Sequence, residues 1–406
     1  MAYDDGRKGH AGTEGMQGCS IVYFGNDWFA ENRTSSHHIA RRLAERFPLL
    51  YVESPGQRAP GTNARDLKKI ASKLQAAVQP PRQLGPRLWH MVMPQIPFRR
   101  LPFVAAANRA AGVFLVRRAM RHLEFGPAIS WFVAPDAGAL AGRLGEDLSV
   151  YYCTDNYSAF PGVDAELLSR MDDDLARRAD QIFVSSPTLL AHKQSLNPDV
   201  AHSPHGVDTD LFAKASETGT PAAPAAAALP KPVIGFFGLI EAWIDLDLVE
   251  FLARARPNWT FLMIGRVAVP APALMGLANV HFPGPQPYES LANWARAFDV
   301  AIIPYRQNQQ VFNANPLKLR EYLATGKPIV AVPTPEIDKF AHCVRIAGEP
   351  ARFLLEIEAA LTEGDDVEKR IIRQQQVRTA TWDARVADIL ATVERRHRAK
   401  HGMPPG

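Results

Sequence analysis

Short apolar runs alternate with helical patterns along most of this chain. Between the first two runs, residues 35–47 (SSHHIARRLAERF) have helical spacing. Strands that alternate with helices favour parallel sheets of the α/β class. Residues 56–125 interrupt this alternation. The runs that predict strands are SIVYFG (20–25), LLYVES (49–54), AISWFV (128–133), LSVYYCT (148–154), QIFVSS (181–186), PVIGFFG (232–238), WTFLMIG (259–265), VAIIPY (300–305) and KPIVAV (327–332).

The chain has 406 residues, more than one hydrophobic core usually supports, so two domains are expected. Residues 213–231 are rich in Ala, Pro and Thr and lack hydrophobic periodicity, which is typical of a linker. Near the end, Trp382, Val386, Ile389, Leu390 and Val393 have helical spacing. The predicted division is a flexible N-terminus (1–19), a Rossmann-like first domain (20–212), the linker (213–231), a Rossmann-like second domain (232–380), a C-terminal helix (381–399) and a tail (400–406).

Two α/β domains joined by a linker predict a ligand site in the cleft between their parallel sheets. In open α/β sheets, ligands bind outside the carboxyl ends of the strands. The candidate site residues are therefore those that directly follow strands. No strand-like run is followed by G-x-G-x-x-G, so a Rossmann dehydrogenase is not expected.

Charge is unevenly distributed in a protein with a formal net charge of only +4. Residues 58–121 hold thirteen Lys or Arg and one acid, Asp66, and apolar residues lie among the arginines of 98–121. This mixture suits contact with anionic lipid headgroups. It is equally explained by a core helix whose arginines face solvent. No nucleic-acid-binding motif accompanies the charge, so nucleic acid is not an expected partner.

The cysteines and the apolar runs indicate a cytoplasmic protein. Cys19, Cys153 and Cys343 lie far apart and have no metal-binding spacing, which fits a reducing compartment. The polar, Gly-rich first twenty residues do not resemble a secretory signal, and no run of eighteen apolar residues occurs. The expected location is the cytoplasm, with the basic segment as a contact to the inner face of the cytoplasmic membrane.

The stretch NANPLKLREYLATGKPIVA (313–331) combines a helix start with two opposite charges. Asn315 is a predicted N-cap and Pro316 the first helical residue. Lys318 and Glu321 share a face at i, i+3 spacing. A helix start and a lysine favour phosphate, whereas Glu321 can accept hydrogen bonds from ribose hydroxyls. The stretch therefore predicts either a nucleoside diphosphate site or a solvent-exposed ion pair on a capped helix.

Several segments resemble one enzyme family. PLKLREYLATGKPIVA (316–331) is similar to the donor-binding signature of GT-B glycosyltransferases related to family 4. SPHGVDTDLF (203–212) resembles the segment that closes their N-terminal domain. Residues 23–56 and 235–249 resemble a polysaccharide-assembly branch of these enzymes. The resemblance implies a GT-B fold, in which two Rossmann-like domains face a central cleft. It also implies a metal-independent hexosyltransferase of cell-surface polysaccharide assembly.

The resemblance also implies roles for particular residues. The donor is a UDP- or GDP-sugar that serves as co-substrate, with no other cofactor, and the acceptor is a saccharide or a lipid-linked saccharide. Asp155 follows a strand of the first domain and is the expected general base for the acceptor hydroxyl; the alternative is that it caps the following turn. The expected donor-binding residues are Lys318, Glu321, Arg266, Asn315, Leu317, Tyr305 and Gly238, and the expected acceptor-binding residues are Asn26, Arg33 and His37.

Two departures from the family pattern leave other functions open. Retaining relatives carry E-x7-E, whereas this chain has Asn313 followed by Glu321. The usual basic pair after the first strand of the second domain is missing, because Leu239 and Ile240 follow Gly238. One alternative is a nucleotide-sugar 2-epimerase of the same fold, which needs no acceptor. The other is a catalytically inactive scaffold at the membrane.

Overall fold

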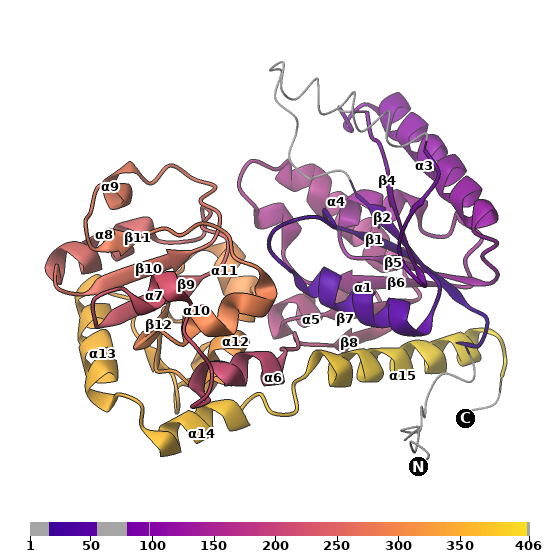
Figure 1. Cartoon of the computed structure of the whole chain (residues 1–406). Helices are drawn as coiled ribbons and strands as arrows, with labels where there is room; N and C mark the ends of the chain where they lie inside the picture. Colours follow the sequence, from indigo (N-terminus) through magenta and orange to yellow (C-terminus); the bar gives the residue numbers. More distant parts are fainter. Residues whose placement is uncertain (1–15, 55–78, 97, 404–406) are drawn as a thin grey trace, which may run out of the picture.

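The computed structural model describes residues 16–54, 79–96 and 98–403, which form two α/β lobes (Figure 1). The N-terminal lobe contains an eight-stranded sheet with the order β3-β4-β2-β1-β5-β6-β7-β8. All its strand pairs are parallel except β3–β4. Its strands are β1 (Ser20–Gly25), β2 (Leu49–Glu53), β3 (Arg82–Gly85), β4 (Leu88–Val92), β5 (Ala128–Phe132), β6 (Leu148–Cys153), β7 (Gln181–Val184) and β8 (Val200–His202).

The C-terminal lobe contains a six-stranded parallel sheet with the order β11-β10-β9-β12-β13-β14. Helices flank both sheets, so every residue of β1, β6, β9 and β10 is buried, which explains why these strands are continuous apolar runs. The strands are β9 (Val233–Phe237), β10 (Thr260–Ile264), β11 (Val280–His281), β12 (Val300–Ile303), β13 (Ile329–Ala331) and β14 (Arg345–Ile346).

The expected α/β class and the paired Rossmann-like lobes are confirmed, and all nine predicted strands are present. The sequence pattern missed β3 and β4 in the interrupted segment, as well as β8, β11 and β14. These five strands are short and only partly buried, so they do not form the continuous apolar runs by which the other strands were predicted.

Helices cover the faces of the N-terminal sheet. The 21-residue helix α3 lies at the outer edge of this lobe, on the side away from the C-terminal lobe (Figure 1). Within the described part of the chain, no helix combines the length and the apolarity that crossing a membrane requires. The helices of this lobe are α1 (Ser35–Arg46), η2 (Pro135–Leu140), α3 (Pro102–His122), η3 (Tyr157–Ala159), α4 (Ala165–Arg178) and α5 (Pro187–Gln194).

The segment expected as a linker is packed rather than extended. Ala215, Ala223 and Ala226, between residues 213 and 231, are buried in the core of the C-terminal lobe. The helices from this segment onward are α6 (Thr209–Ala213), η4 (Lys214–Ser216), α7 (Pro224–Ala227), α8 (Leu246–Ala255), α9 (Pro272–Met275), η5 (Tyr288–Ser290), α10 (Leu291–Ala295), α11 (Gln309–Asn313), α12 (Leu317–Thr325), η6 (Asp338–Phe340), α13 (Pro350–Glu363) and α14 (Val367–Gln375).

The last helix, α15 (Trp382–Lys400), returns from the C-terminal lobe and lies along the N-terminal lobe (Figure 1). Its five predicted apolar positions are buried in the N-terminal core. Trp382 stacks on His38 of α1, with ring centres 4.6 Å apart. The backbone N–H of Val207 donates to the carbonyl of Ala380 at 2.9 Å. The chain therefore crosses between the lobes twice, close together, and α15 restrains their relative position.

Candidate functional site

A cavity of about 720 Å³ lies between the two lobes. Its walls come from the carboxyl ends of β1, β2, β5 and β6 on one side and of β9, β10 and β12 on the other. Both sheets are parallel, so these ends meet at one edge of each sheet, which is where ligands bind in open α/β folds. The volume suits a ligand of several hundred daltons.

The cavity brings together nine of the eleven residues that the sequence singled out. His37 and Glu321 are not among its lining residues. The nine are Asn26, Arg33 and Asp155 from the N-terminal lobe, and Gly238, Arg266, Tyr305, Asn315, Leu317 and Lys318 from the C-terminal lobe.

The start of α12 forms the cationic part of the wall. The Nζ of Lys318 donates to Glu321 Oε2 at 2.8 Å and lies 5.0 Å from the centre of the Phe237 ring. Glu321 is buried, and its carboxylate holds the ammonium group at the cavity. Gly238 allows this placement, because a Cβ there would come within 2.9 Å of Lys318 Cε and the backbone φ is +150°. The first N–H groups of α12 face the same region without helical partners.

The predicted N-cap role of Asn315 is wrong. The helix begins one residue later than expected, with Pro316 as its N-cap residue, and no side chain caps it. The Asn315 amide instead donates to the carbonyl of Ser185 at 2.7 Å, and its oxygen accepts from Arg320 at 2.7 Å. Asn315 is buried between the lobes, so a partner from the other lobe replaces the local cap.

Two arginines add positive charge beside Lys318. Arg33 forms an ion pair with Glu289 and lies over the Tyr288 ring at 5.0 Å. Arg266 lies 3.6 Å from Glu31, and its side chain is more than half exposed. Arg33, Arg266 and Lys318 all line the cavity, and each is paired with a carboxylate, so an anion bound here would share these cations with Glu289, Glu31 and Glu321.

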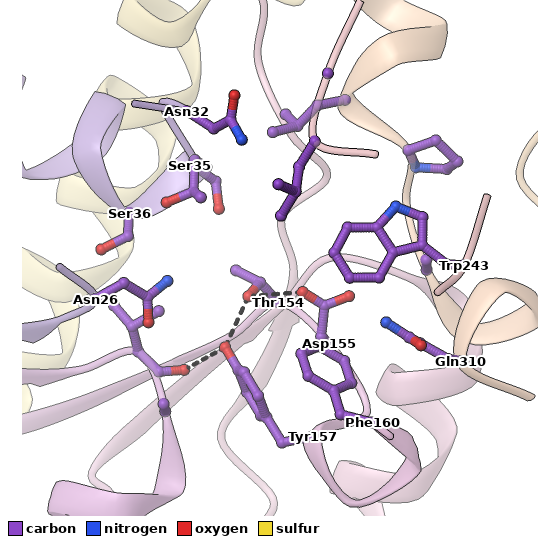
Figure 2. Close-up of a pocket in the computed structure, with 18 of the residues that line it drawn as sticks. Asn26, Asn32, Ser35, Ser36, Thr154, Asp155, Tyr157, Phe160, Trp243 and Gln310 are labelled. Carbon is purple, nitrogen blue, oxygen red and sulfur yellow. Dashed lines mark hydrogen bonds between the residues drawn. The ribbon is translucent and has the colours of Figure 1, made fainter. Parts of the chain in front are cut away.

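Asp155 lies on the opposite side, at the end of β6. Figure 2 shows its carboxylate beside Trp243 and Gln310 of the C-terminal lobe, with Phe160 below it. The hydroxyl of Thr154 donates to it at 3.5 Å. Burial raises the pKa of the Asp155 carboxyl to about 7, although the Thr154 hydroxyl opposes the shift. A carboxyl with this pKa can accept a proton near neutral pH.

Asp136, which follows β5 in η2, is a second cavity carboxyl that sequence reasoning missed. It is buried, and its Oδ1 has no hydrogen-bond partner among the described residues. Burial raises its pKa to about 6, against the lowering effect of the Arg99 charge. Sequence reasoning selected Asp155 because site residues follow strands. The same reasoning applies to the VAPDAG stretch, because Asp136 also follows a strand.

The side chains of His37 and Asn313 form hydrogen bonds within their own lobes. His37 is buried; its Nδ1 accepts from the Thr34 backbone N–H at 3.1 Å, so Nε2 carries the proton and donates to the Asp27 carbonyl at 2.9 Å. These bonds fix the loop between β1 and α1. Asn313, at the position of the family acid, donates to the Gln309 carbonyl at 2.7 Å, and its neighbour Gln310 lines the cavity instead.

Comparisons with known proteins agree with this geometry. Residues 231–363 match the family Glycosyl transferases group 1. The protein named as the teichuronic acid biosynthesis glycosyltransferase TuaH of Bacillus subtilis (strain 168) is 28% identical over 286 residues, which span 64% of this chain and 70% of TuaH.

Solved structures share the fold. HepE of Anabaena, solved in complex with UDP and glucose, superposes with a TM-score of 0.63 at 14% identity, over 92% of this chain and 99% of HepE. A UDP-forming α,α-trehalose-phosphate synthase from Burkholderia vietnamiensis gives 0.65 at 12% identity, over 94% and 99%.

The chain therefore has the GT-B fold. The match of residues 231–363 to group 1 and the similarity to TuaH confirm the resemblance to group 1 glycosyltransferases that the sequence indicated. The assignments of individual donor and acceptor residues stay predictions.

The raised pKa of Asp155 predicts a pH-dependent effect of Asp155→Asn on stability. The carboxyl ionises near pH 4 in the unfolded chain but near 7 in the folded one, so wild-type stability falls as pH rises between these values. The neutral Asn variant escapes this loss. Its melting temperature should exceed that of wild type at about pH 8, and the difference should shrink as the pH falls toward about 4. Asp210→Asn, at an exposed position, is the control and should show no such pH dependence. A difference between Asp155→Asn and wild type that does not change with pH would contradict the shift.

Proposed function

We propose that this enzyme transfers a hexose from a nucleotide-sugar to a lipid-linked saccharide in cell-surface polysaccharide assembly. The observation that carries the proposal is a single cavity with a cationic helix start, at Lys318, on one wall and a carboxyl of raised pKa, Asp155, on the other. Relatedness to a teichuronic acid glycosyltransferase supports the polysaccharide setting. UDP is the favoured nucleotide because two structures of this fold bind or form UDP.

In the proposed donor complex, the diphosphate binds at the N-terminus of α12. The free N–H groups there and the charges of Lys318, Arg33 and Arg266 compensate its negative charge. Gly238 and Gly265 keep this wall tightly packed, because both have positive φ and a Cβ would meet Lys318 Cε at 2.9 Å or the Gly238 carbonyl oxygen at 1.9 Å. Tyr305 and Leu317 form an apolar part of the cavity wall that would contact the rest of the donor.

In the proposed reaction, the Asp155 carboxylate removes the proton of an acceptor hydroxyl, and that oxygen attacks the anomeric carbon. The bond from this carbon to the phosphate oxygen breaks, and the negative charge that develops on the diphosphate is stabilised by Lys318 and the α12 N-terminus. One direct displacement inverts the configuration. Asn313 supports this route, because the acid that retaining relatives carry is replaced by an amide that binds its own helix.

The two alternatives make different predictions. A 2-epimerase would act on the nucleotide-sugar without an acceptor, whereas the proposed enzyme releases UDP only when an acceptor is present. An inactive scaffold would bind no nucleotide, although the cavity offers three cations to a diphosphate. Dependence of UDP release on an acceptor therefore distinguishes the proposed enzyme from a 2-epimerase. Nucleotide binding distinguishes it from an inactive scaffold.

Lys318→Ala should weaken UDP binding about 10- to 100-fold, because it removes a charge-assisted contact to phosphate and leaves buried Glu321 without its cation. Isothermal titration calorimetry measures this change. Lys339→Ala is the matched control, since Lys339 forms the same i, i+3 pair with buried Glu336 outside the cavity. Equal UDP affinity in wild type and Lys318→Ala would contradict the donor assignment.

Asp155→Asn should lower kcat by about 100- to 10,000-fold while UDP affinity stays unchanged, because only the proton acceptor is lost. Asp136→Asn tests the second cavity carboxyl and should retain most of the turnover. Product formation from a UDP-sugar and a lipid-linked acceptor is the measurement. Full activity of Asp155→Asn, or a larger loss in Asp136→Asn, would assign the base elsewhere.

We further propose that α3 and the loop before it contact the anionic cytoplasmic face of the membrane, where a lipid-linked acceptor resides. Phe98, Phe103 and Phe114 are 74%, 70% and 60% exposed. Arg109, Arg117, Arg118 and Arg121 are exposed on the same helix. Apolar side chains among arginines fit the interface of an anionic bilayer. The rest of the predicted basic segment, residues 58–78, lies outside the described residues.

Replacing Phe103 and Phe114 by Ser should strongly reduce co-sedimentation of the protein with phosphatidylglycerol vesicles, since two apolar anchors are lost. Phosphatidylcholine vesicles should bind wild type weakly. Phe251→Ser, at an exposed position of α8 in the other lobe, is the matched control and should leave binding unchanged. Equal sedimentation of the double variant and wild type would contradict membrane contact through α3.

A further inference from the structure

A second cluster of polar groups lies far from the cavity, where α15 ends against the N-terminal lobe. His397 and His401 stand one turn apart at the end of α15, and Asp147 immediately precedes β6. Asp155 follows the carboxyl end of the same strand, so the cluster lies at the opposite edge of the sheet from the proposed active site. The glycosyl transfer reaction gives these three residues no role.

His397 is buried without a hydrogen bond. Its exposed fraction is 5%, and neither ring nitrogen has a hydrogen-bond partner among the described residues. The Nε2 atom points toward Asp147 Oδ2 but stops 3.8 Å away, too far for a hydrogen bond. A buried polar group left unsatisfied costs about 1–3 kcal/mol, so a missing partner is expected at this nitrogen.

The cluster has the dimensions of a metal site. One ligand atom from each of Asp147, His397 and His401 lies within 4.8 Å of the others. Ligand atoms bound to tetrahedral Zn²⁺ are about 3.3 Å apart, since each lies about 2.0–2.1 Å from the ion. The His397–Asp147 separation is already close to this value. His401 is exposed and Asp147 half-buried, so both side chains can close the remaining gap.

We propose that Asp147, His397 and His401 bind Zn²⁺ with a water as the fourth ligand. Two histidines spaced i, i+4 on a helix present their rings on one side, and a carboxylate completes three protein ligands. The ion joins the last turn of α15 to the turn before β6, and so fastens this helix to the N-terminal lobe.

A second cluster of possible metal ligands differs from the first, because its side chains already have partners. Asp172, Asp173 and His192 also lie within metal-ligand reach of one another. Their groups already have partners, because Asp172 accepts from Tyr151 and Lys193, and His192 lies 3.2 Å from Asp173. In the parts of the chain that the structure describes, no buried side-chain atom of this cluster lacks a hydrogen-bond partner, so the cluster serves as an internal control.

The test is calorimetric titration of the full, untagged chain with ZnCl₂ after treatment with EDTA. Wild type should bind one Zn²⁺ and gain thermal stability from it. His401→Ala and Asp147→Asn should each weaken Zn²⁺ binding by more than about tenfold. Both positions are at least partly exposed, so these variants should fold without metal, which circular dichroism checks. His192→Ala should bind Zn²⁺ as wild type does.

Three results would overturn the proposal: no saturable Zn²⁺ binding by wild type, equal affinity in wild type and both ligand variants, or loss of binding in His192→Ala. The first would mean that water or a side-chain shift satisfies His397. UDP affinity of the ligand variants should stay at the wild-type value, so failure here is independent of the glycosyltransferase proposal.

Discussion

The contact between the start of α12 and the N-terminal lobe is the constraint on which the site depends. Asn315 donates to the Ser185 carbonyl at 2.7 Å, and the Ser186 hydroxyl donates to the Asn313 carbonyl at 2.9 Å. Both bonds join the end of β7 to the segment that leads into α12. Because they are short and Asn315 is buried, the helix start is held against the other sheet. Lys318 and Asp155 share one cavity for this reason.

The cavity separates charge between its two walls. Cations from Lys318, Arg33 and Arg266 gather near the α12 N-terminus, while the carboxyls of Asp155 and Asp136 lie at the ends of N-terminal strands. Burial raises the pKa of both carboxyls toward neutrality, so each can exchange a proton at physiological pH. Trp243 and Gln310 of the C-terminal lobe stand beside Asp155 (Figure 2). The surroundings of Asp155 are therefore formed partly by the C-terminal lobe. The position of this lobe relative to the N-terminal lobe affects how far the proposed base is buried.

The features that could be predicted from the sequence are those set by local patterns: the buried strands and the residues that directly follow them. Buried parallel strands are continuous apolar runs, so the pattern predicted nine strands and the α/β class, whereas the GT-B arrangement was implied by the family resemblance. The rule that site residues follow strands found Asp155 and Gly238, and it applied equally to Asp136. Contacts between segments far apart along the chain could not be predicted from the sequence. Asn315 was expected to cap its own helix because only neighbours along the chain were visible, whereas Ser185 of the other lobe takes its amide. The cluster of Asp147 with His397 and His401 likewise joins residues about 250 positions apart, and no spacing rule connects them.

We propose that a nucleoside diphosphate binds between the lobes at the α12 N-terminus, across the cavity from Asp155. A crystal structure of the protein with UDP tests it most directly. Density for the diphosphate is expected within hydrogen-bond distance of Lys318 Nζ and of the first N–H groups of α12. A diphosphate bound elsewhere, with Lys318 still paired only to Glu321, would contradict the proposed donor site.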